Sequence, residues 1–400
     1  MKNKVKITLG EPVVIAQATP DVKHWGPFQF PSINRQSDGK LHCRYHIELD
    51  SATAYGLDGG HAVSGDEGES WAVAPDYKGD GALELPNGDR VRTGNKAAIK
   101  VTEKDLPAQF LCEALLSSTR VPLYEPDSFP YEWGGMYLER LKKGENEWVE
   151  ERVDLFIPYM KRYVVRGLLP YESFIRFRLA PDGALWSVMY PFTYKDNVAG
   201  MTAVFMRSDD CGHSWKYMSG ISYKPDLTDM HWALRAGYTE PNLTFNRDGS
   251  LFCVLRTDDS FFRGPSYCAY SYDGAKTWTE PKRFDDRGVW PSFTELNCGV
   301  TLVGYGRPGL YVRATADPGA KVWDDRVELM PQEQQYYLSC EKCPMQPLSD
   351  DMLEQTCSYC DLIPLNDDTA YCVYSHFSYP NGKGEKCKAI LGRTIKVEIV

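Results

Sequence analysis

The sequence lacks the features that mark membrane proteins, nucleic-acid-binding proteins and helical proteins. No run in its 400 residues approaches the ~20 apolar residues of a membrane-spanning helix. The net charge is -10 with both signs interspersed, and Arg and Lys form no block or stripe. These absences argue against a membrane and against nucleic acid as partners. Helical periodicity is also scarce, so we do not expect a helical fold.

The chain also shows no secretory signal and no linker. Residues 1–17 contain no long apolar stretch and no small-residue cleavage site. We therefore expect a soluble protein that is cytoplasmic as written, or secreted or periplasmic if a signal peptide has been removed. No segment rich in Ser, Gly and Pro divides the chain, so we expect a single domain over residues 1–400.

The 12 cysteines do not predict a disulfide framework, because a chain of this length does not need one. Two pairs, Cys340/Cys343 and Cys357/Cys360, have the C-x2-C-x13-C-x2-C spacing that is typical of zinc sites. Neither pair has the glycine that commonly tightens a zinc knuckle. We therefore expect free thiols in a reducing cell, with no metal and no other cofactor, and zinc is the minority alternative.

What the chain does contain is many short β-type runs joined by tight turns. Aromatic residues make up 13% of it, and it has 33 glycines and 26 prolines. A β-type run, a turn such as Asp-Gly and a second β-type run recur, which is the signature of a hairpin. Six such turns are present, at residues 38–39, 87–88, 182–183, 248–249, 297–299 and 367–368.

A second repeat follows four of these hairpins. Its best example has Ser208, Asp210, Gly212, Ser214 and Trp215, and it recurs at residues 64–71, at 271–278 and, one residue longer, at 315–323. The aspartate and serine can bond backbone N–H groups of the turn, and the glycine permits a positive φ. The tryptophan can bury its ring between neighbouring sheets. The loop is therefore interpreted as a marker of the fold.

Six hairpin units with a recurring loop predict an all-β fold, a six-bladed β-propeller. The main alternative, a pair of β-sandwiches, does not explain why the same loop follows four of the hairpins. The second unit is long and irregular, so we expect an insertion in the second blade over approximately residues 104–170. The runs "VKITL" and "IKVEIV" at the two ends alternate like strands, and their pairing in one blade would close the ring.

A propeller brings the start of each blade's first strand and the end of its second strand to one face near the axis. Residues about eight before and eight after each turn should therefore converge. They are Glu240 with Arg256, Trp290 with Arg307, Tyr359 with Ser375 or His376, and Gln29 or Phe30 with His46, with Glu48 and Asp50 just beyond.

Three of these segments resemble the sialidase (neuraminidase) superfamily, whose repeated loops are called Asp-boxes or BNR repeats. They are "EPNLTFNRDGSLFCVLR", "RPGLYVRATAD" and "SYCDLIPLNDDTAYCVY". The resemblance implies that Tyr359 is the nucleophile, that Glu240 is its base, and that Arg256 and Arg307 bind substrate. A neutral phenol can attack an anionic sugar without charge repulsion, but its ordinary pKa of ~10 requires a base.

The sequence departs from the superfamily at the first blade, where "QFPSI" places Gln29 at the position of the first clamp arginine. A glutamine can bond a sugar hydroxyl but cannot neutralise a carboxylate. The acid/base aspartate of the family lies in the loop after that blade's second strand, and Asp50 is the candidate, with Asp58 and Glu48 behind it. Sialic acid or another terminal sugar, acidic or neutral, could be the substrate.

The sequence thus predicts an exo-acting, retaining glycoside hydrolase that acts on a glycan or a small glycoside. The predicted catalytic residues are Tyr359, Glu240 and Asp50, and the predicted substrate-binding residues are Arg256, Arg307, Gln29, His46, Trp290 and His376. The alternative is a non-catalytic glycan-binding propeller, which would need no tyrosine–glutamate couple. A protein-interaction scaffold would leave the convergence of these residues unexplained.

Overall fold

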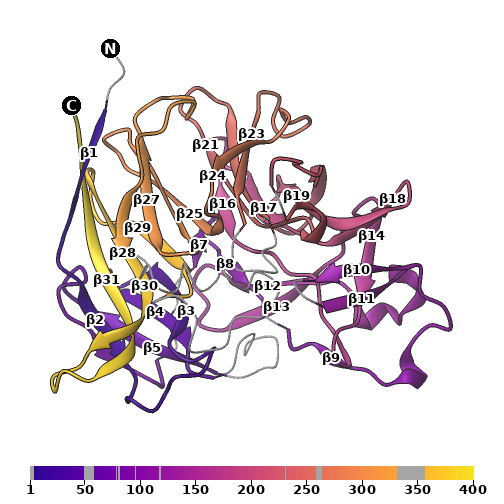
Figure 1. Ribbon diagram of the computed structural model, residues 1–400, viewed down its shortest axis with the longest axis horizontal. Helices are drawn as coiled ribbons and strands as arrows, with labels where there is room; N and C mark the ends of the chain where they lie inside the picture. The colour runs from indigo at the N-terminus through magenta and orange to yellow at the C-terminus, as the bar shows by residue number, and fades with distance from the viewer. Residues whose placement is uncertain are drawn as a thin grey trace.

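The computed structural model describes residues 4–48, 58–77, 79, 82–94, 96–116, 119–229, 231–257, 264–330 and 356–400. In these ranges the secondary structure consists of β-strands and short 3-10 helices, without an α-helix (Figure 1). None of the helices in the described ranges has the length and apolar character to cross a membrane. The runs that alternate between apolar and polar residues thus form strands, as their period of two predicts.

Four sheets have four antiparallel strands each. The first contains β3 (Gln29–Arg35), β4 (Leu41–His46), β5 (Gly59–Ser64) and β6 (Ala72–Val73). The second contains β7 (Leu83–Glu84), β8 (Arg90–Thr93), β12 (Met136–Leu141) and β13 (Trp148–Val153). Another contains β21 (Tyr238–Phe245), β22 (Leu251–Thr257), β23 (Ser266–Ser271) and β24 (Lys282–Asp285). The last contains β25 (Val289–Glu295), β26 (Thr301–Gly306), β27 (Leu310–Thr315) and β28 (Val327–Met330).

The two ends of the chain share a five-stranded sheet. It has the order β1-β31-β30-β29, and β2 also pairs with β31. Its strands are β1 (Val5–Leu9), β2 (Val13–Gln17), β29 (Cys360–Pro364), β30 (Thr369–Pro380) and β31 (Lys386–Ile399). β1 is antiparallel to β31, with Val5 opposite Ile399 and Leu9 opposite Ile395, and the termini lie at the same edge in Figure 1. The predicted pairing of the terminal runs is confirmed.

The remaining large sheet has eight strands, in the order β10-β11-β14-β18-β19-β17-β16 with β20 also paired to β19. They are β10 (Cys112–Leu116), β11 (Thr119–Tyr124), β14 (Met160–Tyr163), β16 (Phe177–Leu179), β17 (Leu185–Met189), β18 (Phe192–Lys195), β19 (Val198–Ser208) and β20 (Lys216–Ser222). Beside it lie a pair of short strands, β9 (Ile99–Lys100) and β15 (Leu168–Leu169), and the 3-10 helices η2 (Glu103–Asp105), η3 (Pro126–Ser128), η4 (Tyr131–Trp133) and η5 (Trp232–Leu234). Residues 104–170, where we expected one insertion, therefore mix strands of this sheet with β12 and β13 of the second.

Successive sheets pack face to face through hydrophobic clusters, which is the arrangement of a β-propeller. Pairs of residues that share such a cluster are Leu138 and Met206, Phe205 and Leu255, Val254 and Tyr305, Val312 and Leu391, and Ile33 and Tyr371. The predicted all-β propeller class is confirmed. The structure shows five regular blades of four or five strands rather than the predicted six, because the remaining sheet is extended by β10, β11, β14 and β18 to eight strands.

The repeated loops have the bonds that their residue types predict. In the loop after β19, Gly212 N–H donates to Ser208 Oγ at 2.8 Å, and Ser214 N–H donates to Asp210 Oδ1 at 2.8 Å. The loops after β5 and β23 repeat both bonds, with Ala275 at the glycine position of the latter. Ala275 accepts the left-handed backbone with φ of 60°. The side-chain and backbone hydrogen bonds that Ser70, Ser214 and Thr277 donate to these aspartates lower the pKa of Asp66, Asp210 and Asp273 to about 2.

The tryptophans of these loops lie between sheets. Trp215 is 7% exposed and belongs to the cluster that joins the second sheet to the eight-stranded one. Trp278 stacks on Phe205 of the neighbouring sheet at 4.2 Å between ring centroids, and its indole N–H donates to Ser219 Oγ at 2.9 Å. The loops therefore fix the packing of one blade on the next.

The carboxylate of Asp361, on β29, joins the edge strands of several sheets. Asp361 Oδ2 accepts a hydrogen bond from Ile33 N–H of β3 at 3.1 Å. Asp361 Oδ1 accepts from Ser292 Oγ of β25 at 3.0 Å and pairs with Arg176, which directly precedes β16, at 2.8 Å. Since β3, β16, β25 and β29 are all edge strands, this one buried group holds the inner edges of four sheets together.

We predict that Trp215→Ala lowers the free energy of unfolding by about 3–5 kcal/mol, because a large buried ring leaves a cavity. Denaturant unfolding measures this change. The matched control is Trp232→Ala, since Trp232 is 39% exposed and should contribute little. An equal loss in both variants would contradict a structural role specific to the loop tryptophan.

Candidate active site

The edge strand β21, its neighbour β22 and the residue before β29 bring three of the predicted site residues into direct contact. The Tyr359 hydroxyl donates a hydrogen bond to Glu240 Oε1. Arg256 Nη1 donates to the Tyr359 hydroxyl oxygen at 3.1 Å and lies 2.5 Å from the same Glu240 oxygen. Glu240 Oε2 accepts the backbone N–H of Trp290 at 3.0 Å. The phenol, the carboxylate and the guanidinium thus form one closed hydrogen-bonded group.

Aromatic rings hold the phenol of Tyr359 in place from two sides. Trp290 stacks on it with centroids 5.1 Å apart and planes at 25°. Phe30 meets it edge-on, with centroids 4.7 Å apart at 89°. The His46 ring also contacts Phe30, at 4.9 Å between ring centroids. Predicted residues from the first, fourth, fifth and terminal hairpins therefore do meet around Tyr359.

Arg307 is also close to Tyr359 and is 5% exposed. Its guanidinium carbon lies 5.9 Å from the centroid of the Tyr359 ring and 5.5 Å from that of Trp25. Its Nη2 donates to the backbone carbonyl of Cys357 at 2.7 Å. That carbonyl orients the guanidinium beside the phenol without neutralising its charge.

A repeated backbone feature explains why these side chains converge. Phe30, Glu240 and Trp290 each have a left-handed backbone, with φ of 53°, 42° and 46°. Each precedes a proline and lies in an irregularity of strand register, between Gln29 and Ser32, between Thr239 and Asn242, and between Val289 and Ser292. A bulge of this kind re-aims a side chain. A left-handed conformation costs of order 1–3 kcal/mol for a non-glycine residue and is concentrated at functional sites.

Tyr359 occupies the corresponding position of the terminal sheet. The hairpin turns are closed by the backbone N–H groups of Gln36, Asn246, Leu296 and Leu365. These four residues follow Phe30, Glu240, Trp290 and Tyr359 at the same distance along the chain. We did not predict this feature, although the dipeptides "FP", "EP" and "WP" at one fixed distance before three turns were a readable signal.

The other predicted residues have different surroundings. Gln29 is fully buried, its Oε1 accepts Gly26 N–H at 3.2 Å, and its Nε2 has no hydrogen-bond partner among the described residues. His376 accepts Ser378 N–H at 3.1 Å and contacts the Tyr379 ring, both on its own strand. Asp50 lies outside the described residues, and the two carboxylates ranked behind it, Glu48 and Asp58, are exposed.

The cysteine pairs are placed only in part. Cys340 and Cys343 lie outside the described residues. Cys357 and Cys360 are fully buried, and Cys357 Sγ lies 2.9 Å from Ser375 Oγ. Cys360 is part of the hydrophobic cluster of the terminal sheet. For this second pair, the surroundings are those of core thiols.

The electrostatics of the site keep Tyr359 protonated. Burial raises the pKa of its hydroxyl well above the ordinary value, and the negative charge of Glu240 raises it further. Arg256 and Arg307 act in the opposite direction. The phenol is therefore a neutral donor near pH 7, and it can become a nucleophile only if a base takes its proton as it reacts.

The fold resembles that of solved sialidases. A protein of unknown function from Dyadobacter fermentans matches with a TM-score of 0.65 and 16% identity over 98% of this chain and 99% of that one. The Hadza microbial sialidase Hz136 matches with a TM-score of 0.51 and 15% identity, over 93% of this chain and 65% of that one. The K499G mutant of the NanB sialidase from Streptococcus pneumoniae matches with a TM-score of 0.51 and 11% identity, over 96% of this chain and 70% of that one.

No family model and no curated protein matches the sequence. The structural matches confirm the sialidase-like fold that the sequence motifs predicted. At sequence identities of 11–16%, these matches show a shared fold alone.

We predict that Arg256→Met lowers the free energy of unfolding by about 3–5 kcal/mol, because it leaves the buried Glu240 carboxylate without its partner. Adding Glu240→Gln should restore part of this loss, which a double-mutant cycle in denaturant measures. The matched control is Arg35→Met, which breaks an exposed ion pair with Glu67 and should cost below about 1 kcal/mol. If the losses in unfolding free energy of the two single variants simply add in the double variant, Arg256 and Glu240 do not interact, which would contradict the closed hydrogen-bonded group.

Proposed function

We propose that the protein is an exo-acting, retaining glycoside hydrolase that uses Tyr359 as nucleophile and Glu240 as its base. One observation carries this proposal: the Tyr359 hydroxyl donates to Glu240, while Arg256 contacts both oxygens. A phenol with a raised pKa needs a base within hydrogen-bond distance, and this one has it. The solved sialidases that share the fold support the class of reaction.

In the first step, the Tyr359 oxygen would attack the anomeric carbon while its proton passes to Glu240. The bond to the leaving group breaks as an acid gives that group a proton. In the second step, water would attack the same carbon, its proton would go to the former acid, and Glu240 would return its proton to Tyr359. Two displacements retain the anomeric configuration, and the net reaction is hydrolysis.

The arginines would stabilise the charge that develops on the phenol oxygen. Arg256 already donates to that oxygen, and the Arg307 guanidinium carbon lies 5.9 Å from the centroid of the Tyr359 ring. Both lower the pKa of Tyr359 against the effect of burial. Their positive charge would favour the phenolate as nucleophile and, in the second step, as leaving group.

Asp50 remains the proposed acid/base residue, with Asp58 and Glu48 as alternatives. The proposed substrate contacts are those of Arg307, Trp290, His46, Gln29, His376 and Arg256. Arg256 contacts both Tyr359 and Glu240, so its main role would be to hold these two side chains in position. Gln29 at the clamp position favours a terminal sugar that offers a hydroxyl there rather than a carboxylate, because glutamine cannot neutralise a charge.

We also propose that β16, β17, β19 and β20 form the sixth blade. Its third strand, β19, is followed by the same Ser-x-Asp loop that follows β5 and β23, the third strands of two regular blades. The strands β10, β11, β14 and β18 would then be additions to that blade.

We predict that Tyr359→Phe removes most of the turnover of the chromogenic glycoside that the wild type cleaves best in a screen that includes a sialoside. Affinity for the released sugar should change little, because only a hydroxyl is lost. Glu240→Gln should lower kcat by about 10²–10⁴-fold, as expected for a lost general base. The matched control, Tyr272→Phe, alters a 61% exposed tyrosine and should leave the rate unchanged.

Full turnover in Tyr359→Phe would refute the nucleophile. A wild-type protein that binds sugars but cleaves none of the glycosides would instead favour the glycan-binding alternative, because binding needs no tyrosine–glutamate couple.

A separate prediction concerns the acidic substrate. Arg307→Ala should weaken binding of a sialoside by about tenfold or more, since a charged hydrogen bond contributes about 1.5–3 kcal/mol, and should affect a neutral glycoside much less. Gln29→Arg should act in the opposite direction and strengthen sialoside binding. Equal effects of Arg307→Ala on both classes of glycoside would show that Arg307 does not contact a substrate carboxylate.

A further inference from the structure

A cavity of about 690 Å³ lies away from the group formed by Tyr359, Glu240 and Arg256, between the second sheet and the extension of the eight-stranded sheet. It is lined by η3, η4, the start of β12, the end of β13, the start of β14 and Glu172, which lies between β15 and β16. None of the residues predicted for the catalytic site lines it. Its volume is that of a pocket for a small molecule.

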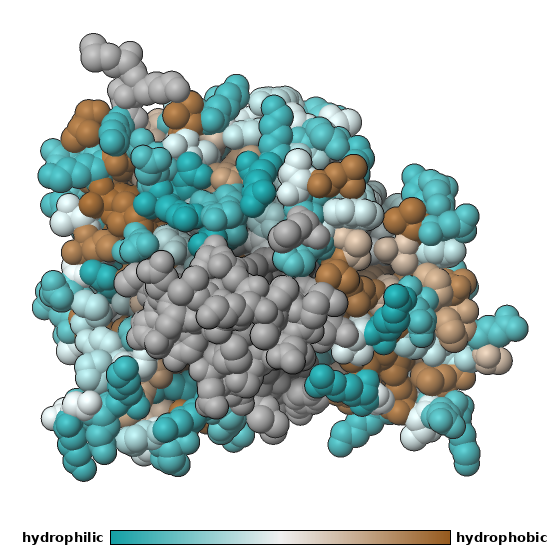
Figure 2. All heavy atoms as spheres, viewed as in Figure 1, coloured by the Kyte–Doolittle hydropathy of each residue, from teal (hydrophilic) through white to brown (hydrophobic). Residues whose placement is uncertain are grey.

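Most of the wall is apolar. Met136, Val153 and Ile157 belong to the hydrophobic cluster that joins the second and eight-stranded sheets, and Phe129 belongs to a separate cluster. At the mouth Tyr131 and Phe156 are 69% and 82% exposed. In Figure 2, hydrophobic residues gather on the same side of the molecule, over β10, β11 and β14. Exposed aromatic rings beside a concave apolar wall are typical of a ligand site.

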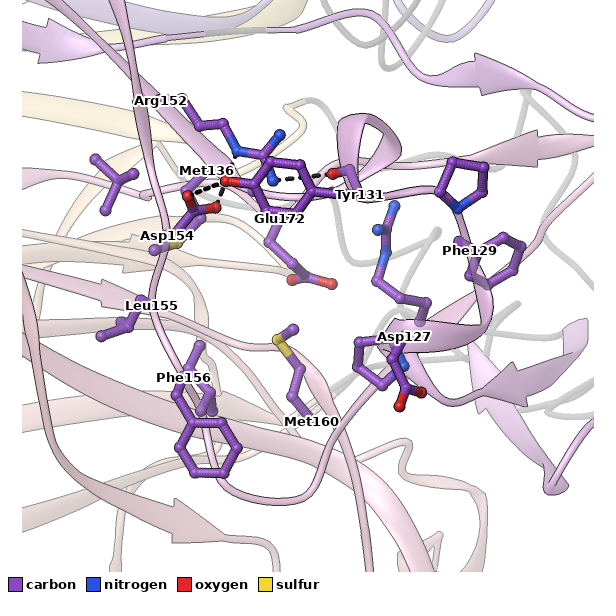
Figure 3. A pocket seen from close by; sticks show the side chains of 17 residues that line it. Asp127, Phe129, Tyr131, Met136, Arg152, Asp154, Leu155, Phe156, Met160 and Glu172 are labelled. Carbon is purple, nitrogen blue, oxygen red and sulfur yellow. Dashed lines mark hydrogen bonds and ion pairs between the residues drawn. The ribbon is translucent and has the colours of Figure 1, made fainter.

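One carboxylate points into this apolar space. Figure 3 shows Glu172 directed into the cavity, towards Met160 and between the walls that carry Tyr131 and Phe156. Among the described residues, Glu172 makes no hydrogen bond and no ion pair. The nearby Arg162 does not pair with it, because its Nη1 and Nη2 donate to the carbonyls of Trp133 at 3.0 Å and Pro170 at 2.7 Å. A half-buried carboxylate without a partner is costly and favours a cationic ligand.

The other polar groups of the cavity are paired or lie at its rim. Arg152 bonds Asp154 at 2.9 Å and the carbonyl of Tyr131 at 2.9 Å, and the Tyr131 hydroxyl donates to Asp154 at 2.5 Å. Asp127 is exposed at the rim. Arg152 and Asp154 offset each other. Arg162 also lines the cavity, but its Nη1 and Nη2 are turned to carbonyl oxygens. Glu172 is therefore the one lining carboxylate that is neither ion-paired nor at the rim among the described residues.

We propose that this cavity binds an organic ammonium ion with an apolar body. The nitrogen would bond the Glu172 carboxylate, and the carbon skeleton would lie against Met160 and Phe156. Aromatic faces at the mouth attract cations and apolar groups alike. An anionic ligand would be repelled by Glu172, and a ligand with many hydroxyl groups would find few partners in this wall. The proposal does not depend on the glycosidase proposal.

The proton on Glu172 gives the proposal a pH signature. Burial raises the pKa of Glu172 to about 7, while Arg162 acts in the opposite direction. The titratable or charged groups around it are Arg162, Tyr163, Tyr171, Arg152, Asp154, Asp127 and Tyr131. Ordinary carboxyl, phenol and guanidinium groups do not change charge between pH 6 and pH 8. If the ammonium ion requires the ionised carboxylate, its affinity should rise about tenfold over this range.

The test is calorimetric titration of the full chain with 4-phenylbutylamine and with its neutral analogue 4-phenylbutan-1-ol, at pH 6 and pH 8. The amine should bind the wild type about tenfold more tightly at pH 8, and more tightly than the alcohol. Glu172→Gln should weaken amine binding at pH 8 by at least about tenfold and abolish its pH dependence. The matched control Glu145→Gln, which removes an exposed carboxylate of the turn between β12 and β13 outside the cavity lining, should retain both.

Folding of the variant is measured separately. Neutralising a carboxylate whose pKa is raised in the folded state removes a cost that appears as pH rises above its unfolded value of about 4.3. Glu172→Gln should therefore melt no lower than the wild type at pH 8. The proposal is overturned if the amine does not bind the wild type, if it binds Glu172→Gln equally well, or if the alcohol binds as tightly. Binding of a neutral methyl glycoside in place of the amine would overturn it too.

Discussion

The buried carboxylate of Asp361 is the interaction on which the arrangement of the candidate active site depends. It joins Ile33 of β3, Ser292 of β25 and Arg176 before β16 to β29. These contacts fix the edge strands of four sheets relative to one another, so the residues at the starts of those strands have fixed positions as well. A carboxylate in such a place is stabilised only while each of its partners is present. The propeller and the site are therefore coupled through the same group.

A recurring backbone conformation at the starts of these edge strands orients the side chains of the site. Phe30, Glu240 and Trp290 adopt left-handed conformations at bulges in three edge strands, and each is followed by a proline. Tyr359 stands at the matching place in a fourth. The strain is offset by the contacts that the bulges permit, above all the bonds of Glu240 to Tyr359, Arg256 and the Trp290 N–H. The repeated architecture thus supplies four equivalent positions, which the sequence fills with three aromatic residues and one glutamate.

Local patterns in the sequence were enough to predict much of this. The Asp-Gly turns and the Ser-x-Asp loops have local causes, and both form as expected. The convergence of Glu240, Arg256, Trp290 and Tyr359 followed from counting residues outward from each turn. The pairing of β1 with β31 followed from their alternation.

Features that depend on distant pairing could not be predicted in this way. The attachment of β10, β11 and β14 to the eight-stranded sheet requires partners far along the chain, and local period does not specify them. The placement of Glu172 in an apolar cavity arises where two sheets meet, so no motif marks it. His376 was expected at the pit from its distance to a turn; its bond from Ser378 and its ring contact with Tyr379 lie on its own strand, and its role stays a prediction.

The central claim is that Tyr359 forms a covalent bond to the sugar. Mass spectrometry of the protein after reaction with a fluorinated analogue of its substrate, which slows the second step, tests this most directly. We expect one added sugar on the peptide that contains Tyr359, and no adduct in Tyr359→Phe. An adduct on a carboxylate residue, or turnover of the unmodified substrate with no adduct on Tyr359, would contradict it.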